Sequence, residues 1–251
     1  MSTKIQENAQ RLLLSYIAHH YDLHLKEAAH TDMPHDAFLD DLLAREVEQR
    51  RNNRLKKRLS NARFPYKKYL VDFDRTAFPP PIARTMKALE SLEFIQNKEN
   101  LVLIGNPGVG KTHLAIALGI EACMQDMRVL FTHVPNLLTE MRESMSQNRM
   151  GAFRRKFEKY DVVILDELGY ISFDKEGNEM LFNLLSSRND KGSIIVTTNL
   201  VFERWDEVFH DPILTAALVD RLAHKSYVLD MTGDSYRIKE TKQWLEKHEQ
   251  K

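Results

Sequence analysis

The sequence predicts an α/β fold in which a parallel five-stranded sheet follows a small all-helical N-terminal domain. Five short apolar runs between residues 101 and 229 alternate with helical patterns, as expected for strands that helices cover on both faces. The first run, Leu101–Ile104, leads directly into a glycine-rich turn. The third, Val162–Leu165, is followed at once by two carboxylates. Charge is therefore expected at the sheet edge where α/β proteins bind their ligands.

The N-terminal region has the apolar spacing of amphipathic helices. Apolar residues recur at intervals of three and four from Ile5 to Leu25 and again from Phe38 to Val47. We therefore expect residues 1–63 to form a helical arm that binds DNA or a partner. Four prolines then interrupt regular structure. Residues 64–81 are predicted to be a linker, and residues 82–251 the main α/β domain.

Apolar periodicity predicts each element of this main domain. The predicted strands are residues 101–104, 129–131, 162–165, 194–196 and 227–229. The predicted helices are residues 82–95, a helix from 111, a pair of helices across residues 136–159, residues 180–188 and 214–222, and a helix near Trp205.

A phosphate-binding motif follows the first predicted strand. Its glycines free backbone N–H groups to wrap phosphate oxygens, and the helix that starts there turns its N-terminal dipole toward an anion. In this pattern Lys111 would reach the β- and γ-phosphates, and the Thr112 hydroxyl would hold Mg²⁺. We call residues 105–112 the glycine loop and expect ATP and Mg²⁺ to bind there. The residues predicted to contact the nucleotide are Gly105, Asn106, Pro107, Gly108, Val109, Gly110, Lys111, Thr112 and His113.

Two adjacent carboxylates, Asp166 and Glu167, form the second half of the predicted site. Asp166 fits the acid that supports the Mg²⁺ shell, and Glu167 fits a base that polarises the attacking water. Because neighbouring side chains on a strand alternate, we expect the two to point to opposite faces. Hydrolysis needs only a positioned water, whereas a kinase needs an acceptor pocket, so the pair favours an ATPase. Helix capping is the alternative role for acids at a strand end.

Asn199 ends the fourth predicted strand, where it could orient the attacking water or contact the γ-phosphate with support from Thr198. A turn asparagine is the alternative. Downstream, Arg204 and Arg221 are candidates for an arginine finger that stabilises transition-state charge in a neighbouring subunit's site. Arginines on helices are more often solvated or ion-paired, so spacing alone does not choose between the two.

Charge is unevenly distributed along a chain whose formal net charge is zero. Ten basic residues against two acidic ones lie between residues 45 and 70, and a second basic stretch lies within residues 137–159. Such segregation predicts contacts to DNA phosphates without sequence reading; a solvated helix face is the alternative. The DNA-binding candidates are Arg50, Arg51, Arg54, Lys57, Arg58, Arg142, Arg149 and Arg154.

Composition argues against several classes of protein. Cys123 is the only cysteine, so a disulfide framework and a thiolate zinc site are excluded. No apolar run approaches the ~20 residues of a membrane span, and the N-terminus lacks an apolar signal core. We therefore expect a cytoplasmic protein without a membrane partner.

Together these motifs resemble those of the AAA+ ATPases of the IstB/DnaC-like group. The resemblance rests on residues 105–112, 166–170, 197–199 and 220–222, and extends to residues 64–74 and 233–237. It covers nearly the whole chain and is strongest to the IstB-type ATPases that assist transposition of bacterial insertion sequences. It implies an AAA+ P-loop NTPase that hydrolyses ATP and forms a homo-oligomer with ATP sites at subunit interfaces. It further implies that the oligomer binds duplex DNA and helps a partner transposase to select or remodel its target site.

The resemblance also implies roles for single residues. Arg221 matches the arginine that acts in trans, ahead of Arg204, and Asn199 matches the sensor position. Residues 137–159 match a helical insertion that can line a nucleic-acid channel. About twenty residues follow the last predicted strand, too few for the C-terminal lid domain of other AAA+ proteins. Arg237 is the candidate replacement for the second sensor arginine that this lid carries.

Three alternatives stay open. A replicative helicase loader of the DnaC type would share the ATPase domain but use its N-terminal region to grip a helicase, whereas a basic run suits DNA. A nucleotide-gated binding module would not hydrolyse ATP, and the presence of Glu167 argues against it. A nucleotide kinase would transfer phosphate to a small acceptor and would not respond to DNA.

Overall fold

The computed structural model describes residues 3–170, 172–188 and 190–249. The chain divides into two units, Met1–Lys57 and Arg58–Lys251. One helix, α3 (His35–Ala62), contributes residues to both units. The second unit begins before residue 64, so it includes the whole predicted linker as well as the α/β domain.

The N-terminal unit is helical, as its apolar spacing predicts. It contains α1 (Lys4–Arg11), α2 (Ser15–His30) and the first part of α3. The periodic run from Ile5 to Leu25 is divided between α1 and α2, because Leu13 adopts a left-handed backbone conformation with φ +57°. The small apolar core of this unit consists of Ala9, Ile17, Ala18 and Leu42.

A buried carboxylate anchors the start of α2. Glu46 accepts hydrogen bonds from the backbone N–H groups of Tyr16 and Ile17, at 2.8 and 3.2 Å, and from Arg50 Nε at 2.8 Å. Burial alone would raise the pKa of Glu46, but the hydrogen bonds from Arg50 and from the two backbone groups together lower it. A carboxylate on α3 therefore satisfies backbone donors that a helix N-terminus leaves unpaired.

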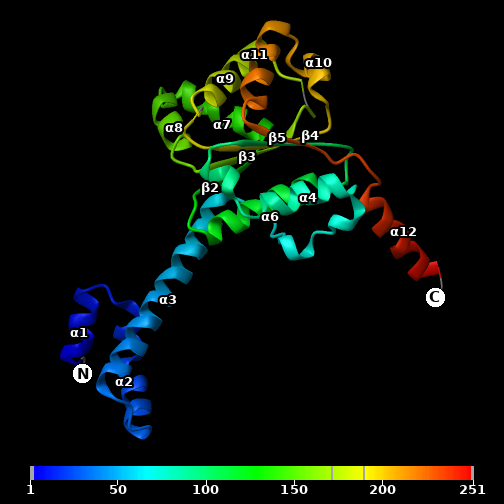
Figure 1. The fold of residues 1–251 in the computed structure, drawn as a ribbon. Helices are drawn as coiled ribbons and strands as arrows, with labels where there is room; N and C mark the ends of the chain where they lie inside the picture. The colour runs from blue at the N-terminus through cyan, green and yellow to red at the C-terminus, as the bar shows by residue number, and fades with distance from the viewer. Residues whose placement is uncertain (1–2, 171, 189, 250–251) are drawn as a thin grey trace. The chain divides into compact units, whose positions relative to one another are not determined.

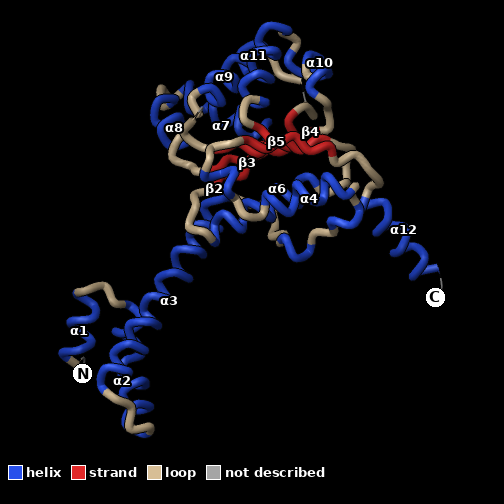
Figure 2. The backbone as a smooth tube through the Cα atoms, in the orientation of Figure 1, coloured by secondary structure: helices blue, strands red, loops and turns tan. Residues whose placement is uncertain are grey.

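The second unit is built on the predicted parallel five-stranded sheet. Its strand order is β2-β3-β4-β1-β5, and every neighbouring pair is parallel. The sheet forms the red central layer in Figure 2. The strands are β1 (Asn100–Ile104), β2 (Val129–His133), β3 (Val162–Leu168), β4 (Ser193–Thr198) and β5 (Ser226–Asp230).

Helices cover both faces of the sheet, which explains why its central strands β1, β3 and β4 are mostly buried and mostly apolar. Figure 1 shows α4 and α6 on one face and α7, α9 and α11 on the other. These helices are α4 (Pro80–Leu89), α6 (Lys111–Met124), α7 (Val134–Ser146), α9 (Lys175–Ser186) and α11 (Pro212–Ala223). The shorter elements are α5 (Glu93–Gln96), α8 (Met150–Phe157), α10 (Asp206–Phe209) and the 3₁₀ turns η1 (Leu70–Asp72), η2 (Arg75–Ala77) and η3 (Phe202–Arg204).

The structure divides one helical stretch that periodicity alone left continuous. The predicted helix over residues 82–95 ends at Leu89 and resumes as α5, because Leu92 has φ +60°. The helices predicted across residues 136–159 are α7 and α8, which are separated beside Asn148, where φ is +54°. Left-handed residues of this kind end a helix without a glycine or proline signal in the sequence.

The described residues after β5 contain one helix, α12 (Tyr236–Glu249). No helix among the described residues combines the length and the apolar character that crossing a membrane requires.

Candidate nucleotide-binding site

The glycine loop connects β1 to α6 and folds around the N-terminus of that helix. Gly108 and Gly110 have φ +86° and +100°, a left-handed region in which other residues are strained. Ser235 also lies against Gly108 so closely that a β-carbon there would collide with its hydroxyl. Both glycines therefore serve the turn, and Gly108 also allows the close approach of the C-terminal segment.

Lys111 is the first residue of α6, and its side chain folds back over the glycine loop. Its Nζ donates hydrogen bonds to the carbonyl oxygens of Gly105, at 2.7 Å, and Asn106, at 2.9 Å. The residue is only 6% exposed. Burial lowers the pKa of Lys111 to about 8, although the nearby Asp166 acts in the opposite direction. Burial thus disfavours the charged form of Lys111, and an anionic phosphate bound beside it would stabilise that form.

Asp166 joins the glycine loop to the neighbouring strands. Its Oδ1 accepts hydrogen bonds from the hydroxyls of Thr112, at 2.9 Å, and Thr197, at 2.6 Å. Thr197, which the sequence did not single out as a site residue, also accepts a hydrogen bond from the backbone N–H of Glu167 at 3.0 Å. Thr112 and Asp166 thus lie together as predicted. A hydroxyl and a carboxylate are oxygen ligands of the kind that Mg²⁺ prefers, so these residues fit that ion.

Glu167 lies where β3 departs from regular geometry. The register of β3 against β4 shifts between Leu165 and Leu168, and Glu167 has φ +63°. The expectation that Asp166 and Glu167 point to opposite faces is therefore wrong, because a bulge re-aims a side chain. Both carboxylates instead approach the same imidazole, that of His133. The Asp166 side chain is 2% exposed and that of Glu167 48% exposed.

His133 is a site residue that sequence reasoning missed. It ends β2 and pairs in register with Asp166 on β3. Its Nδ1 lies 3.3 Å from Asp166 Oδ2 and 3.6 Å from Glu167 Oε2. A polar residue that closes an apolar strand next to the carboxylate strand is the signal that could have revealed it.

A cavity of about 470 Å³ opens beside the glycine loop. Its lining includes Lys111, Thr112, Glu167 and Arg237. The predicted linker also forms part of the cavity wall, although its prolines indicated only irregular structure. The lining residues from that segment are Tyr66, Lys67, Lys68, Tyr69, Asp72, Phe73, Asp74, Ala77 and Phe78.

Ring contacts fix the linker against the start of α6. The Phe73 ring meets the His113 imidazole edge to face, with centroids 5.2 Å apart, and stacks on Phe78 at 6.0 Å. The pKa of His113 is lowered, chiefly by burial. At the other end of the chain, the backbone N–H of Tyr236 donates to the Gly108 carbonyl at 2.9 Å, so Arg237 follows directly on a contact with the glycine loop.

The other predicted catalytic residues lie outside this cavity. Asn199 follows β4, and its buried Oδ1 makes no hydrogen bond to the described residues; Thr197 on the same strand lines the cavity. Arg204 forms a surface ion pair with Glu207 at 2.8 Å. The guanidinium of Arg221 lies over the ring of Phe182, with its central carbon 4.6 Å from the centroid.

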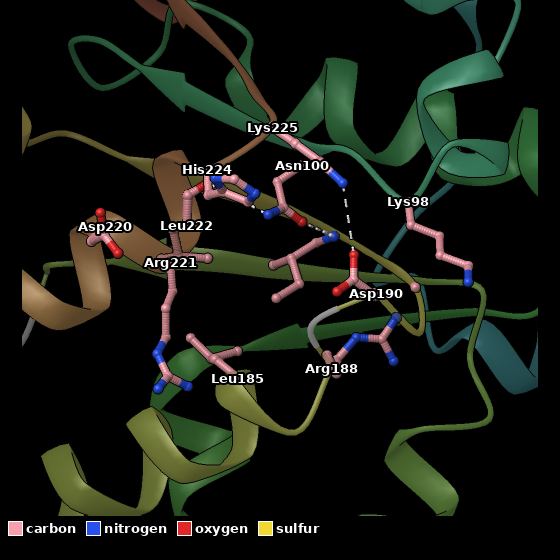
Figure 3. A pocket seen from close by; sticks show the side chains of 12 residues that line it. Lys98, Asn100, Leu185, Arg188, Asp190, Asp220, Arg221, Leu222, His224 and Lys225 are labelled. Carbon is pink, nitrogen blue, oxygen red and sulfur yellow. Dashed lines mark hydrogen bonds and ion pairs between the residues drawn. The ribbon is translucent and has the colours of Figure 1, made fainter.

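Arg221 lines a second cavity, of about 350 Å³, whose lining residues are drawn in Figure 3. This cavity lies at the edge of the sheet where β1 begins. Asn100 lines it too and starts β1, whereas the glycine loop follows the other end of that strand. At about 3.3 Å per residue, the strand separates the two cavities by about 16 Å. The structure therefore does not bring Arg221 to the glycine loop of its own chain.

The DNA-binding candidates fall into two groups. Three of them form ion pairs: Arg50 with Glu46, Arg58 with Asp126, and Arg142 with Asp174. The others are exposed and have no ion pair with a described residue: Arg51, Arg54, Lys57, Arg149 and Arg154. The exposed group retains its full charge for an anionic partner.

Comparison with known proteins places this site in a family. The family model for the IstB-like ATP binding protein matches residues 7–244. The chain belongs to the IstB-like ATP-binding family. The protein assigned as ATP-binding in insertion sequence IS21 of Pseudomonas aeruginosa is 38% identical over 230 residues, which cover 92% of this chain and 87% of that relative. Its counterpart in IS5376 of Geobacillus stearothermophilus is 32% identical and covers 98% of each chain.

Solved structures show that this IstB-like protein has the AAA+ fold. The DnaC helicase loader superposes with a TM-score of 0.53 at 18% identity, over 71% of this chain and 99% of that one. DnaI gives a TM-score of 0.54 at 21% identity, over 65% of this chain and 90% of that one. At these identities the likeness establishes the fold alone.

Because its family binds ATP, the lowered pKa of Lys111 predicts that nucleotide binding is linked to proton uptake. The free site has a Lys111 pKa of about 8, and added phosphate charge raises it toward the ordinary value. At pH 7 the amine is already protonated. At pH 9 we expect uptake of about 0.9 proton per ATP and an affinity that falls about tenfold per pH unit above 8.

Calorimetry at pH 9 in two buffers of different ionisation enthalpy measures this uptake. Lys111→Arg is the matched control, because a guanidinium stays protonated over this range. Equal binding heats in both buffers for the unaltered protein would contradict the prediction.

Proposed function

We propose that this IstB-like protein is a Mg²⁺-dependent ATPase that assembles on duplex DNA and helps a partner transposase to select or remodel its target site. The observation that carries the proposal is the arrangement around Asp166. This carboxylate holds the Thr112 hydroxyl, while Glu167 reaches the same cavity as Lys111. A phosphate seated on the glycine loop would therefore meet a cation, a Mg²⁺ ligand pair and a base.

Each residue has a distinct task in the proposed hydrolysis. Lys111 would exchange its two carbonyl partners for phosphate oxygens, and backbone N–H groups of the loop would bind the remaining oxygens. Thr112 and Asp166 would hold Mg²⁺, which neutralises phosphate charge when bound. Glu167 would accept a proton from the attacking water. Arg237 lines the cavity and would add positive charge on the side of α12.

The transposition role is supported by the insertion-sequence relatives, because they match this chain over nearly its full length. The exposed arginines of α3 and α8 supply charge for DNA phosphates. A helicase-loader role is supported only by the shared fold. Arg221 lies too far from the glycine loop of its own chain to act there. If it acts on ATP, it must do so in a neighbouring subunit, which would place ATP at a subunit interface.

Duplex DNA is expected to stimulate ATP hydrolysis. We test whether exposed arginines make the DNA contacts by replacing two of them. Arg51→Ala/Arg54→Ala should bind duplex DNA more weakly, and the slope of log affinity against log salt should shrink by about 0.9 for each phosphate that the variant no longer neutralises. Phosphate release and fluorescence anisotropy, each measured across a salt series, give the two readouts.

Arg45→Ala is the matched control, because Arg45 lies on the same helix but is engaged with Asp41 at 3.0 Å. It should retain the salt slope of the unaltered protein. An unchanged slope in the double variant would exclude these arginines as phosphate contacts. A rate of ATP turnover that does not change when duplex DNA is added would contradict the proposed function itself.

A further inference from the structure

Two neighbouring strands bring an imidazole and two carboxylates to one point beside the glycine loop. His133 ends β2, and Asp166 lies opposite it on β3, followed by Glu167. One side-chain atom of each lies within 4.8 Å of the other two. Among the described residues, no second group of three histidine, cysteine, aspartate or glutamate side chains converges in this way.

The imidazole of His133 is left incompletely satisfied. The side chain is 36% exposed, but its Nδ1 is buried and makes no hydrogen bond to a described residue, although carboxylate oxygens lie 3.3 and 3.6 Å away. Buried polar atoms are nearly always hydrogen-bonded, so an exception requires an explanation such as an ion at that place. The nitrogen lies close to two carboxylates, those of Asp166 and Glu167.

Asp166 divides its two oxygens between separate tasks. Oδ1 accepts from the hydroxyls of Thr112 and Thr197. Oδ2 is the oxygen that faces His133. A cation bound to Oδ2 would therefore leave the hydrogen bonds to both threonines in place.

The distances suit a first-row transition metal. Metal–nitrogen and metal–oxygen bonds of about 2.0–2.2 Å in a tetrahedral site separate neighbouring donors by about 3.3–3.6 Å. The Nδ1 of His133 lies at such distances from both carboxylates. Glu167 is half exposed, so rotation of its side chain can close the remaining gap. An imidazole with two carboxylates suits Zn²⁺, Co²⁺ or Mn²⁺, whereas Mg²⁺ takes oxygen ligands.

We propose that His133, Asp166 and Glu167 bind one transition-metal dication, with Zn²⁺ as the physiological candidate, when no nucleotide is bound. The site takes the two carboxylates that ATP hydrolysis is proposed to use. Asp166 and Glu167 therefore cannot bind Zn²⁺ and take part in ATP hydrolysis at the same time. The proposal rests on the three side chains and extends beyond the proposed ATPase function.

Titration of the nucleotide-free, full-length protein with Co²⁺ tests the site directly. Co²⁺ bound to nitrogen and oxygen gives visible absorption bands, and Zn²⁺ has none because its d shell is full. We expect one Co²⁺ per chain, and loss of the bands when Zn²⁺ is added. His133→Ala should weaken Co²⁺ binding at least tenfold, as should Glu167→Ala.

His113→Ala is the matched control, because this histidine lines the same cavity but lies outside the group of three. It should bind Co²⁺ as the unaltered protein does. Circular dichroism, measured on the same preparations, reports whether each variant is folded.

The proposal is overturned if Co²⁺ does not bind below millimolar concentration, or if His133→Ala or Glu167→Ala binds it as tightly as the unaltered protein. Co²⁺ binding and ATP hydrolysis, measured separately, distinguish failure of the metal site from failure of the proposed ATPase function. Absent Co²⁺ binding with intact DNA-stimulated hydrolysis refutes the metal site alone. Intact Co²⁺ binding without hydrolysis refutes the ATPase alone.

Discussion

Glu167→Gln is expected to reduce ATP turnover by about 10²- to 10⁴-fold while ATP remains bound, because an amide cannot accept the proton of the attacking water. The change keeps the size of the side chain, and the backbone N–H that bonds to Thr197 is untouched. Binding depends on the glycine loop and Lys111, which do not change. Phosphate release and the affinity for a fluorescent ATP analogue measure the two effects separately.

Glu179→Gln is the control for this prediction. Glu179 lies exposed on α9, outside the lining of the cavity beside the glycine loop, and its replacement by glutamine removes the same charge. Its turnover should stay within a factor of two of the unaltered protein. If Glu167→Gln also retains turnover within about tenfold, Glu167 is not the general base, and a water held by other groups must account for hydrolysis.

The elements of the α/β domain could be predicted from sequence because their signals are local. Continuous apolar runs define the five strands, and each observed strand overlaps its predicted range. The glycine loop is equally local, since Lys111 and Thr112 stand at fixed spacing from its glycines. Asp166 could be placed at the ligand edge because the carboxyl ends of parallel strands share one edge.

The rest of the site depends on tertiary contacts that carry no local signal. The prolines after residue 64 indicate irregular structure but not that Phe73 packs on His113 and closes a cavity. The backbone of Glu167 has φ +63° although glutamate has no preference for that region. Alternation along an ideal strand therefore gives the wrong side-chain direction at this position.

The role of Arg221 depends on a second chain and therefore has no local signal in the sequence. Spacing did not separate it from Arg204, and a family resemblance was needed to prefer it. The structure adds that Arg204 is engaged with Glu207, whereas Arg221 lies at the sheet edge opposite the glycine loop. A second chain is the simplest way to bring Arg221 to a phosphate.

Arg221→Ala is expected to slow hydrolysis by about 10³-fold or more if this arginine stabilises transition-state charge in a neighbouring subunit. Arg204→Ala should have little effect, because an exposed ion pair adds little to stability and nothing to a distant site. Thermal unfolding checks that removing the guanidinium from the Phe182 ring has not simply unfolded α11. Phosphate release measures the rate.

Mixing variants distinguishes action in trans from action within one chain. Glu167→Gln retains an intact Arg221, and Arg221→Ala retains an intact Glu167. In a head-to-tail assembly of equal amounts, about a quarter of the interfaces combine an unaltered Glu167 with an unaltered Arg221. Activity should therefore return to about a quarter of the unaltered level, although each variant alone is inactive. If no mixing ratio restores hydrolysis while ATP-dependent assembly persists, Arg221 does not complete a neighbour's site, and its packing on Phe182 is its whole role.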